Sequence, residues 1–306
     1  MACGGSRAYQ GIATLPLSDK AVIINIKTNR IMQNKFYSGR YGRIIIHTPH
    51  AGTELPIHFH VVKHIGAVKH NCAVKAFYRP FYMQLTDHYT DKLFSCIVHW
   101  PNAIRPSDQA FITQVSFPYS RLFCDVERLP NDPLEEKGLG IHYNFSKFTN
   151  RGDNWYLLPG DAFRLYNEHQ AKLLACVDYP FIGRSLILDC HSFSERDNIL
   201  CPNAHEYKDI DICLGFNEDE TKPSEEFIDS VKNFFTDRGY RVEYNKPFSN
   251  SKTVQNWKHW ERPNYHSLMI EVNKHCYMNE DTLEITAGYY KLHAELQELY
   301  KLLLNY

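Results

Sequence analysis

The chain has 306 residues, with 34 Lys and Arg against 35 Asp and Glu, so its formal net charge at pH 7 is -1. This balance excludes the strongly basic surface that indicates a nucleic-acid or anionic-membrane partner. Hydrophobic residues make up 43% and charged residues 23%, which excludes a disordered chain. The 16 histidines are the unusual feature, because imidazole binds metals and transfers protons near neutral pH.

Short runs rich in Ile and Val predict strands, and several runs are continuous, as in strands buried on both faces of an α/β sheet. Helical periodicity predicts helices between them. We therefore expect one domain, residues 1–306, with a mixed, mostly parallel sheet flanked by helices on both faces. The predicted strands are Ala21–Ile26, Arg43–His47, Phe111–Phe117, Ser185–Asp189, Tyr240–Tyr244 and Ser267–Val272, and the predicted helices are Asp161–Cys176, Glu225–Arg238 and Leu292–Leu303.

The termini and cysteines indicate a cytoplasmic protein. The first ten residues lack the basic start and apolar core of a secretory signal. The apolar runs are strand-sized, well short of the roughly 18 residues of a membrane span. The nine cysteines are scattered without a CxxC pair, which favours a reducing compartment.

Two histidines follow predicted strands and are candidate metal ligands. His50 comes shortly after Arg43–His47, and His191 shortly after Ser185–Asp189. In such folds ligands bind beyond the carboxyl ends of the strands. A hydrolytic Zn²⁺ usually takes three His or carboxylate ligands and keeps one position for water. Two carboxylates are candidates for the third ligand, Glu54 and Asp87.

Glu271 lies inside the apolar run Ser267–Val272. A carboxylate there is costly to bury without a partner. It either pairs with a core cation or has a raised pKa suited to proton transfer. The two histidines at neighbouring strand ends favour proton transfer.

Arg121 and Arg128 follow the predicted strand Phe111–Phe117. A pair of arginines is suited to clamp a substrate carboxylate through bidentate hydrogen bonds. Arg121 is equally placed for an ordinary salt bridge with Asp125. Both interpretations stay open from the residues alone.

Together these segments resemble the N-formylglutamate amidohydrolase (N-formylglutamate deformylase) family. The matching stretches follow the family's order from about Arg43 to Met278, so residues 1–42 are a possible extension outside the resemblance. They are TPHAGTELP (Thr48–Pro56), LTDHYTDKLF (Leu85–Phe94), YSRLFCDVERLPNDPLEEKGLGIHY (Tyr119–Tyr143), LILDCHSFSE (Leu186–Glu195), DICLGF (Asp211–Phe216), VEYNKPFS (Val242–Ser249) and HSLMIEVNKHCYM (His266–Met278).

The resemblance implies a fold similar to that of the zinc carboxypeptidases, with one Zn²⁺ at the strand ends. The implied metal ligands are His50, Asp87 and His191. The usual His-x-x-Glu motif is absent, which leaves the third ligand open; Asp87 is the first choice because the Thr-Asp pair belongs to the family pattern, and Glu54 is the second choice. Glu271 falls where the wider group keeps its catalytic Glu. DVER resembles the Asp-x-Asn-Arg segment whose Arg binds a substrate carboxylate, with Glu127 in place of the Asn.

The implied reaction is hydrolysis of N-formyl-L-glutamate to formate and L-glutamate, with Arg128 and Arg121 holding a carboxylate of this small molecule. Fe²⁺, Co²⁺ and Mn²⁺ accept similar ligands. The alternatives are another N-acyl-amino-acid amidohydrolase or carboxypeptidase-like enzyme, and a non-catalytic binding protein. A histidine-rich metal buffer is a further alternative, built from His58, His60, His64 and His70.

Overall fold

The computed structural model describes residues 41–54, 61–63, 66–67, 81–96, 111–144, 147, 155–157, 159–177, 184–254 and 264–305. All of them lie in the compact unit Gly39–Tyr306. Two sequence-based predictions fall outside the described residues: the strand Ala21–Ile26 and the group of His58, His60, His64 and His70.

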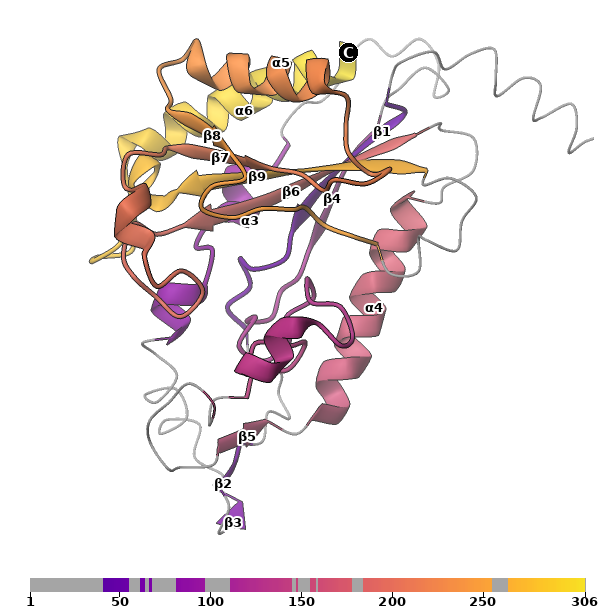
Figure 1. Cartoon of the computed structure of the whole chain (residues 1–306), viewed down its shortest axis with the longest axis vertical. Coiled ribbons are helices and arrows are strands. Elements are labelled where there is room, and N and C mark those ends of the chain that lie inside the picture. The colour runs from indigo at the N-terminus through magenta and orange to yellow at the C-terminus, as the bar shows by residue number, and fades with distance from the viewer. Residues whose placement is uncertain are drawn as a thin grey trace, which may run out of the picture. The chain divides into compact units, whose positions relative to one another are not determined.

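A six-stranded sheet forms the centre of the described structure (Figure 1). Its spatial order is β4-β1-β6-β9-β7-β8. The first four strands of this order are parallel, and β7 runs antiparallel to β9 and parallel to β8. The predicted mixed, mostly parallel sheet is therefore confirmed. The strands are β1 (Arg43–Thr48), β4 (Phe111–Ser116), β6 (Ser185–Phe193), β7 (Ile212–Gly215), β8 (Val242–Tyr244) and β9 (Tyr265–Asn273).

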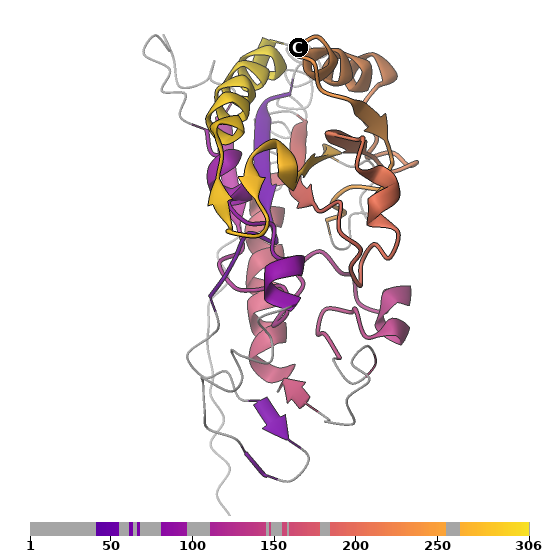
Figure 2. The same ribbon diagram turned by 90° about the vertical axis from the view of Figure 1, so that its left-hand side faces the viewer.

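Helices cover both faces of this sheet, α5 and α6 on one and α4 on the other (Figures 1 and 2). Successive side chains of a strand point to opposite faces. Ile44 and Ile46 of β1 accordingly pack in the core that α5 and α6 share, whereas Ile45 packs with Leu173 of α4. The helices are α4 (Pro159–Val177), α5 (Glu225–Thr236) and α6 (Ala287–Asn305).

The helix α5 shows how the sequence sets an element's limits. Ser224 caps its start, its hydroxyl accepting a hydrogen bond from the Phe227 amide at 3.3 Å. Its buried face follows the helical period. The chain leaves the helix after Thr236 and reaches Gly239, whose φ of 90° lies in the left-handed region that glycine tolerates best.

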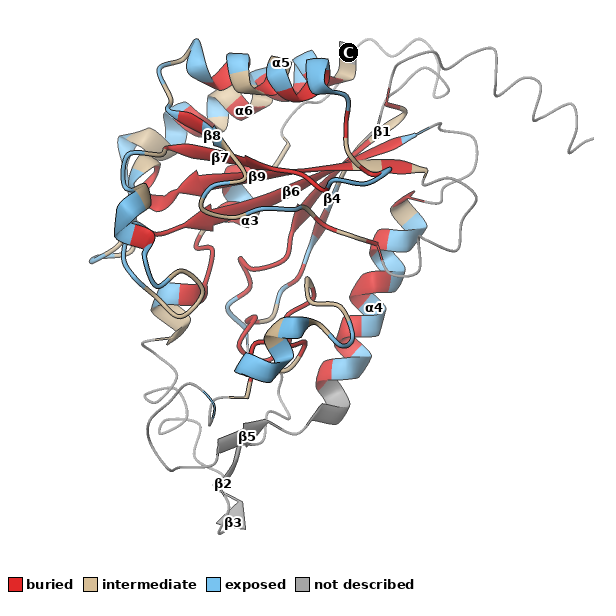
Figure 3. Ribbon diagram, viewed as in Figure 1, coloured by how far each residue is buried: buried red, intermediate tan, exposed pale blue. Residues whose placement is uncertain are grey.

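The strands β6 and β9 are longer than predicted, because their backbones stay paired through the polar residues. The register joins His191 to Glu271 and continues to Phe193 and Asn273. All nine residues of β6 are buried (Figure 3). His191 and Glu271 are therefore strand residues at the carboxyl-terminal part of the sheet, held more rigidly than loop residues.

Smaller elements complete the described structure. No helix within the described residues is long and apolar enough to cross a membrane. The remaining elements are the strands β2 (Val61–Lys63), β3 (Gly66–Ala67), β5 (Trp155–Leu157), β10 (Met278–Asn279) and β11 (Glu284–Ile285), the short helix α3 (Thr90–Leu93), and the 3₁₀ turns Pro133–Lys137, Ala204–Tyr207 and Lys274–Cys276.

Candidate metal centre

His50 lies two residues beyond the end of β1, in a loop fixed by close backbone packing. A Cβ on Gly52 would meet the carbonyl oxygens of Phe117 and Tyr119 well inside contact distance. Only glycine fits this approach. The loop therefore holds the His50 ring in a buried position at the sheet edge.

Asp87 is joined to the His50 loop through the backbone. Its amide donates to the His50 carbonyl at 3.0 Å, and its own carbonyl accepts from the Thr90 hydroxyl at 2.9 Å. The Asp87 side chain is buried, whereas Glu54 is exposed. Of the two carboxylates that the sequence offers as third ligand, Asp87 is the one that the structure brings to His50 and His191.

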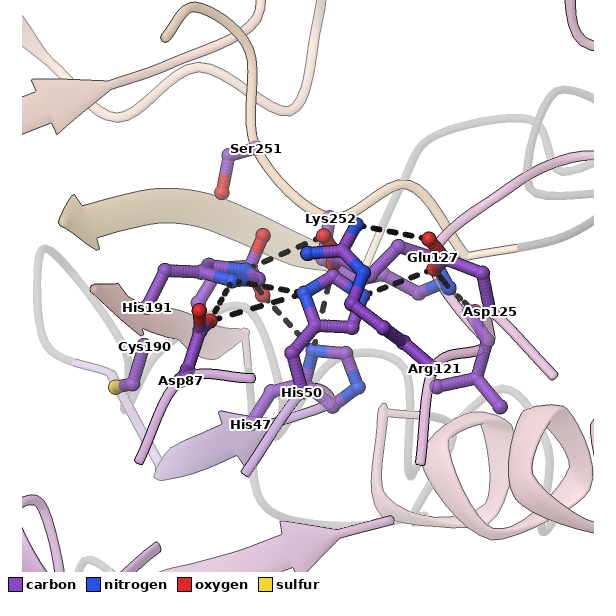
Figure 4. Close-up of polar contacts among 12 residues, drawn as sticks. His47, His50, Asp87, Arg121, Asp125, Glu127, Cys190, His191, Ser251 and Lys252 are labelled. Atoms are coloured by element: carbon purple, nitrogen blue, oxygen red, sulfur yellow. Dashed lines mark hydrogen bonds and ion pairs between the residues drawn. The ribbon is translucent and has the colours of Figure 1, made fainter. Parts of the chain in front are cut away.

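Three donor atoms meet at this edge of the sheet (Figure 4). His50 Nδ1 lies 3.3 Å from His191 Nδ1. Asp87 Oδ2 lies 3.1 Å from His191 Nδ1 and 3.7 Å from His50 Nδ1. Ligands of a tetrahedral Zn²⁺ with bonds of 2.0–2.1 Å are about 3.3–3.4 Å apart. The donor set and its spacing therefore fit such an ion.

The electrostatics of the two imidazoles differ. Burial, with Arg121 nearby, lowers the pKa of His50, which keeps its ring in the neutral form that binds metals. Burial alone would also lower the pKa of His191, but the carboxylates of Glu127 and Asp189 raise it well above its usual value. A divalent cation is favoured in such a field, since it compensates the same carboxylates.

Glu127 approaches His191 from the opposite side of the ring. Its Oε2 lies 3.2 Å from His191 Nε2, and with His50 and His191 it forms a second possible ligand set. The donor atoms of the set with Asp87 lie 3.1–3.7 Å apart, and those of the set with Glu127 lie within 4.8 Å of one another. Elsewhere in the described chain, Asp211, His275 and Cys276 also cluster, but both Asp211 oxygens already accept hydrogen bonds from Arg241.

Glu271 lies beside this centre because the sheet register pairs it with His191. Its side chain is buried, and Oε2 has no hydrogen-bond partner among the described residues. Burial raises the pKa of Glu271 to about 8. No cation among the described residues donates a hydrogen bond to Oε2, so the environment of Glu271 suits a group that exchanges protons near neutral pH.

Asp125 is the site residue whose role the sequence interpretation missed. Its Oδ1 lies 2.9 Å from His50 Nε2, the ring nitrogen that faces away from the three donors. Its Oδ2 accepts from Arg121 Nη2 at 2.8 Å and from the Tyr143 hydroxyl at 2.9 Å. A carboxylate on the outer nitrogen fixes the tautomer and orientation of a metal-binding histidine. The sequence contained an indication of this role, because Asp125 is the first residue of the DVER segment that resembles Asp-x-Asn-Arg.

The two candidate arginines differ in burial and in how many hydrogen bonds they already make. Arg121 is buried, and besides Asp125 it donates from Nε to the Tyr143 hydroxyl at 3.1 Å, so the salt-bridge interpretation from the sequence describes its contacts. Arg128 is about one-fifth exposed, lies 3.6 Å from Asp125 Oδ2, and makes no hydrogen bond from Nε. Arg128 is thus the better placed of the two to receive a carboxylate.

Comparison with known proteins supplies independent findings. The sequence profile of N-formylglutamate amidohydrolase matches residues 42–278. The structure is similar to the crystal structure of N-formylglutamate amidohydrolase from Ralstonia eutropha JMP134, with a TM-score of 0.59 and 22% sequence identity. The similarity covers 88% of this chain and 95% of that chain, and it supports the α/β fold class. No curated protein sequence matches the chain.

Proposed function

Since the chain belongs to the N-formylglutamate amidohydrolase family, we propose that the centre around His50 hydrolyses the C–N bond of N-formyl-L-glutamate with the help of a divalent metal. The observation that carries the proposal is the spacing of His50, Asp87 and His191, whose donor atoms lie 3.1–3.7 Å apart. Zn²⁺ is the ion we favour for this mixed set, and Fe²⁺, Co²⁺ and Mn²⁺ are the alternatives.

A metal bound there would supply Lewis-acid activation of the formyl oxygen and of the attacking water. In the proposal, Glu271 removes a proton from that water, which attacks the formyl carbon. The C–N bond then breaks, and Glu271 delivers the proton to the departing nitrogen. The products are formate and L-glutamate. The buried, unpartnered Oε2 and the raised pKa of Glu271 support this role.

Arg128 would bind a carboxylate of the substrate. Its partly exposed guanidinium with an unbonded Nε supports this, and a planar guanidinium matches a carboxylate bidentately. Arg121 is proposed to assist Arg128 in binding this carboxylate. Because Arg121 donates hydrogen bonds to Asp125 and Tyr143, its contribution is mainly to hold the segment that contains Asp125 in place. Gln170 and Lys252 hold the same segment, each donating to the Val126 carbonyl at 2.7 Å.

The proposed compartment is the cytoplasm. Every cysteine within the described residues is a free thiol, which supports a reducing environment.

The test is turnover by purified protein on matched N-formyl, N-acetyl and N-succinyl amino acids, with formate and free amino acid both quantified. We expect release from N-formyl-L-glutamate that is lost on metal removal and restored by added Zn²⁺. Faster cleavage of N-acetyl or N-succinyl substrates would point instead to another N-acyl-amino-acid amidohydrolase. Bound metal without turnover of any substrate would favour a non-catalytic binding protein.

A further inference from the structure

Asp125 lies against the outer ring nitrogen of His50, and a different carboxylate, Asp189, lies near the outer ring nitrogen of His191. Asp189 and His191 are two residues apart on β6, so their side chains point to the same face. The register between β1 and β6 sets His47 directly beside Asp189. Three polar residues therefore form a row on the face that α4 covers.

The two nitrogens of the His191 ring have separate partners (Figure 4). Nδ1 faces the donor atoms of His50 and Asp87. Nε2 lies 3.1 Å from Asp189 Oδ1 and 3.2 Å from Glu127 Oε2. These contacts are ion pairs, since Nε2 makes no hydrogen bond with a described residue. The ring is almost fully buried. These two carboxylates are therefore the candidates for the group that sets how His191 presents Nδ1.

Asp189 is the better anchored of the two. Its Oδ1 lies 2.9 Å from His47 Nδ1, and its side chain is 2% exposed. The Glu127 side chain is 19% exposed, and its Oε1 has no hydrogen-bond partner. A residue fixed by its own hydrogen bonds holds a ligand more firmly than one that can rotate toward solvent.

His47 is itself held from α4. Its Nε2 lies 2.9 Å from His169 Nε2. Burial, together with the neighbouring His47, lowers the pKa of His169 to about 2, so that ring is neutral. Because the Asp189 carboxylate only accepts, His47 donates to it from Nδ1. The contact with His169 then fixes the second nitrogen of His47.

We propose that Asp189, held by His47 and His169, is the positioning residue that orients His191 for metal binding. The inference rests on the proposed metal centre and goes beyond it, since it assigns a positioning function to three residues outside the proposed ligand set. His47 and Asp189, with Glu127, also form a group that could itself hold a metal ion. It also assigns each ligand histidine its own carboxylate, Asp125 for His50 and Asp189 for His191.

The experiment measures Zn²⁺ affinity by chelator competition and records the visible absorption spectrum of the Co²⁺-loaded protein. Asp189→Asn is expected to weaken Zn²⁺ binding about 10–100-fold and to change the Co²⁺ spectrum. Glu127→Gln is expected to cost markedly less. The matched control is His266→Gln, a half-buried histidine of the same sheet that bonds Tyr41 and Arg184 instead, and it should leave both readouts unchanged.

A second pair of variants keeps the test valid if Asp189→Asn does not fold. His47→Asn retains an N–H near the position of Nδ1, whereas His47→Leu removes it. The leucine variant should lose affinity, and the asparagine variant should recover most of it. Equal affinity in Asp189→Asn and wild type, or a larger loss in Glu127→Gln, overturns the positioning role. If the wild-type protein binds neither Zn²⁺ nor Co²⁺, the metal centre itself is refuted.

Discussion

Replacing Asp125 by Asn tests how the buried carboxylate holds the candidate site together. Asn keeps one acceptor for His50 but presents an amide group where Oδ2 accepts from Arg121 and Tyr143. A lost charge-assisted hydrogen bond costs about 1.5–3 kcal/mol and a lost neutral one about 0.5–1.5 kcal/mol. Arg121 would also be left buried without its partner, and breaking a buried pair typically costs about 3–5 kcal/mol. We expect a loss of free energy of unfolding in that range.

The assay is urea unfolding of the chelator-treated protein, so that bound metal adds nothing to stability. Arg121→Met should destabilise by a similar amount, because it removes the cation closest to the buried Asp125 carboxylate and leaves only Arg128, at 3.6 Å, in its place. The double variant removes both charges and should therefore cost clearly less than the sum of the two single changes. Additive losses, or a cost below about 1 kcal/mol for Asp125→Asn, would refute the view that this buried pair holds the site.

Three further predictions concern the metal, the base and acid stability. Glu271→Gln should retain metal while kcat falls about 10²–10⁴-fold; wild-type turnover would exclude it as the base. Asp87→Asn should weaken Zn²⁺ binding by more than the roughly 10–100-fold that is typical for residues contacting the ligands. Glu54→Gln should leave Zn²⁺ binding unchanged. The reverse order of the two variants in a chelator titration would identify Glu54 as the ligand. Burial alone would raise the pKa of Asp211, but Arg241 and other donors lower it to about 2. Its stabilisation is therefore present above about pH 4 and is lost as the pH falls toward 2.

For Asp211 the measurement is the difference in free energy of unfolding between wild type and Asp211→Asn, followed from pH 5 down to pH 2. We expect a difference of about 1–2 kcal/mol at pH 5, less than the full shift implies because the Arg241 side chain is 52% exposed. The difference should close at low pH. A gap that stays constant over this range would contradict the assigned pKa shift.

The sequence predicts most of the sheet because the strands that carry it are continuous apolar runs. Arg43–His47 and Ser185–Asp189 have no polar interruption before their ends, and both are confirmed as strands. The missed strand, β7, is only Ile212–Gly215. Its antiparallel pairing with β9 is a contact between segments far apart in the chain, which a local apolar pattern does not indicate.

The candidate site was predictable as far as the residue types indicate chemistry. His50, His191 and Glu271 carry groups that bind metals or move protons, and the structure brings them together. The contributions of Asp125 and Asp189 were not predictable in the same way. Each depends on which nitrogen of a histidine ring faces outward, and that is set by packing between segments far apart in the chain.

The backbone hydrogen bond from the Asp87 amide to the His50 carbonyl has a consequence for how the chain between them can change. It ties both ends of the intervening segment at the site itself. The loop-closure entropy of a segment whose ends are tied together rises slowly with its length, by roughly 0.6 kcal/mol for each doubling. Insertions between Glu54 and Phe81 should therefore leave the spacing of the two candidate ligands intact. This makes the segment the natural place for the chain to vary in length while keeping its chemistry.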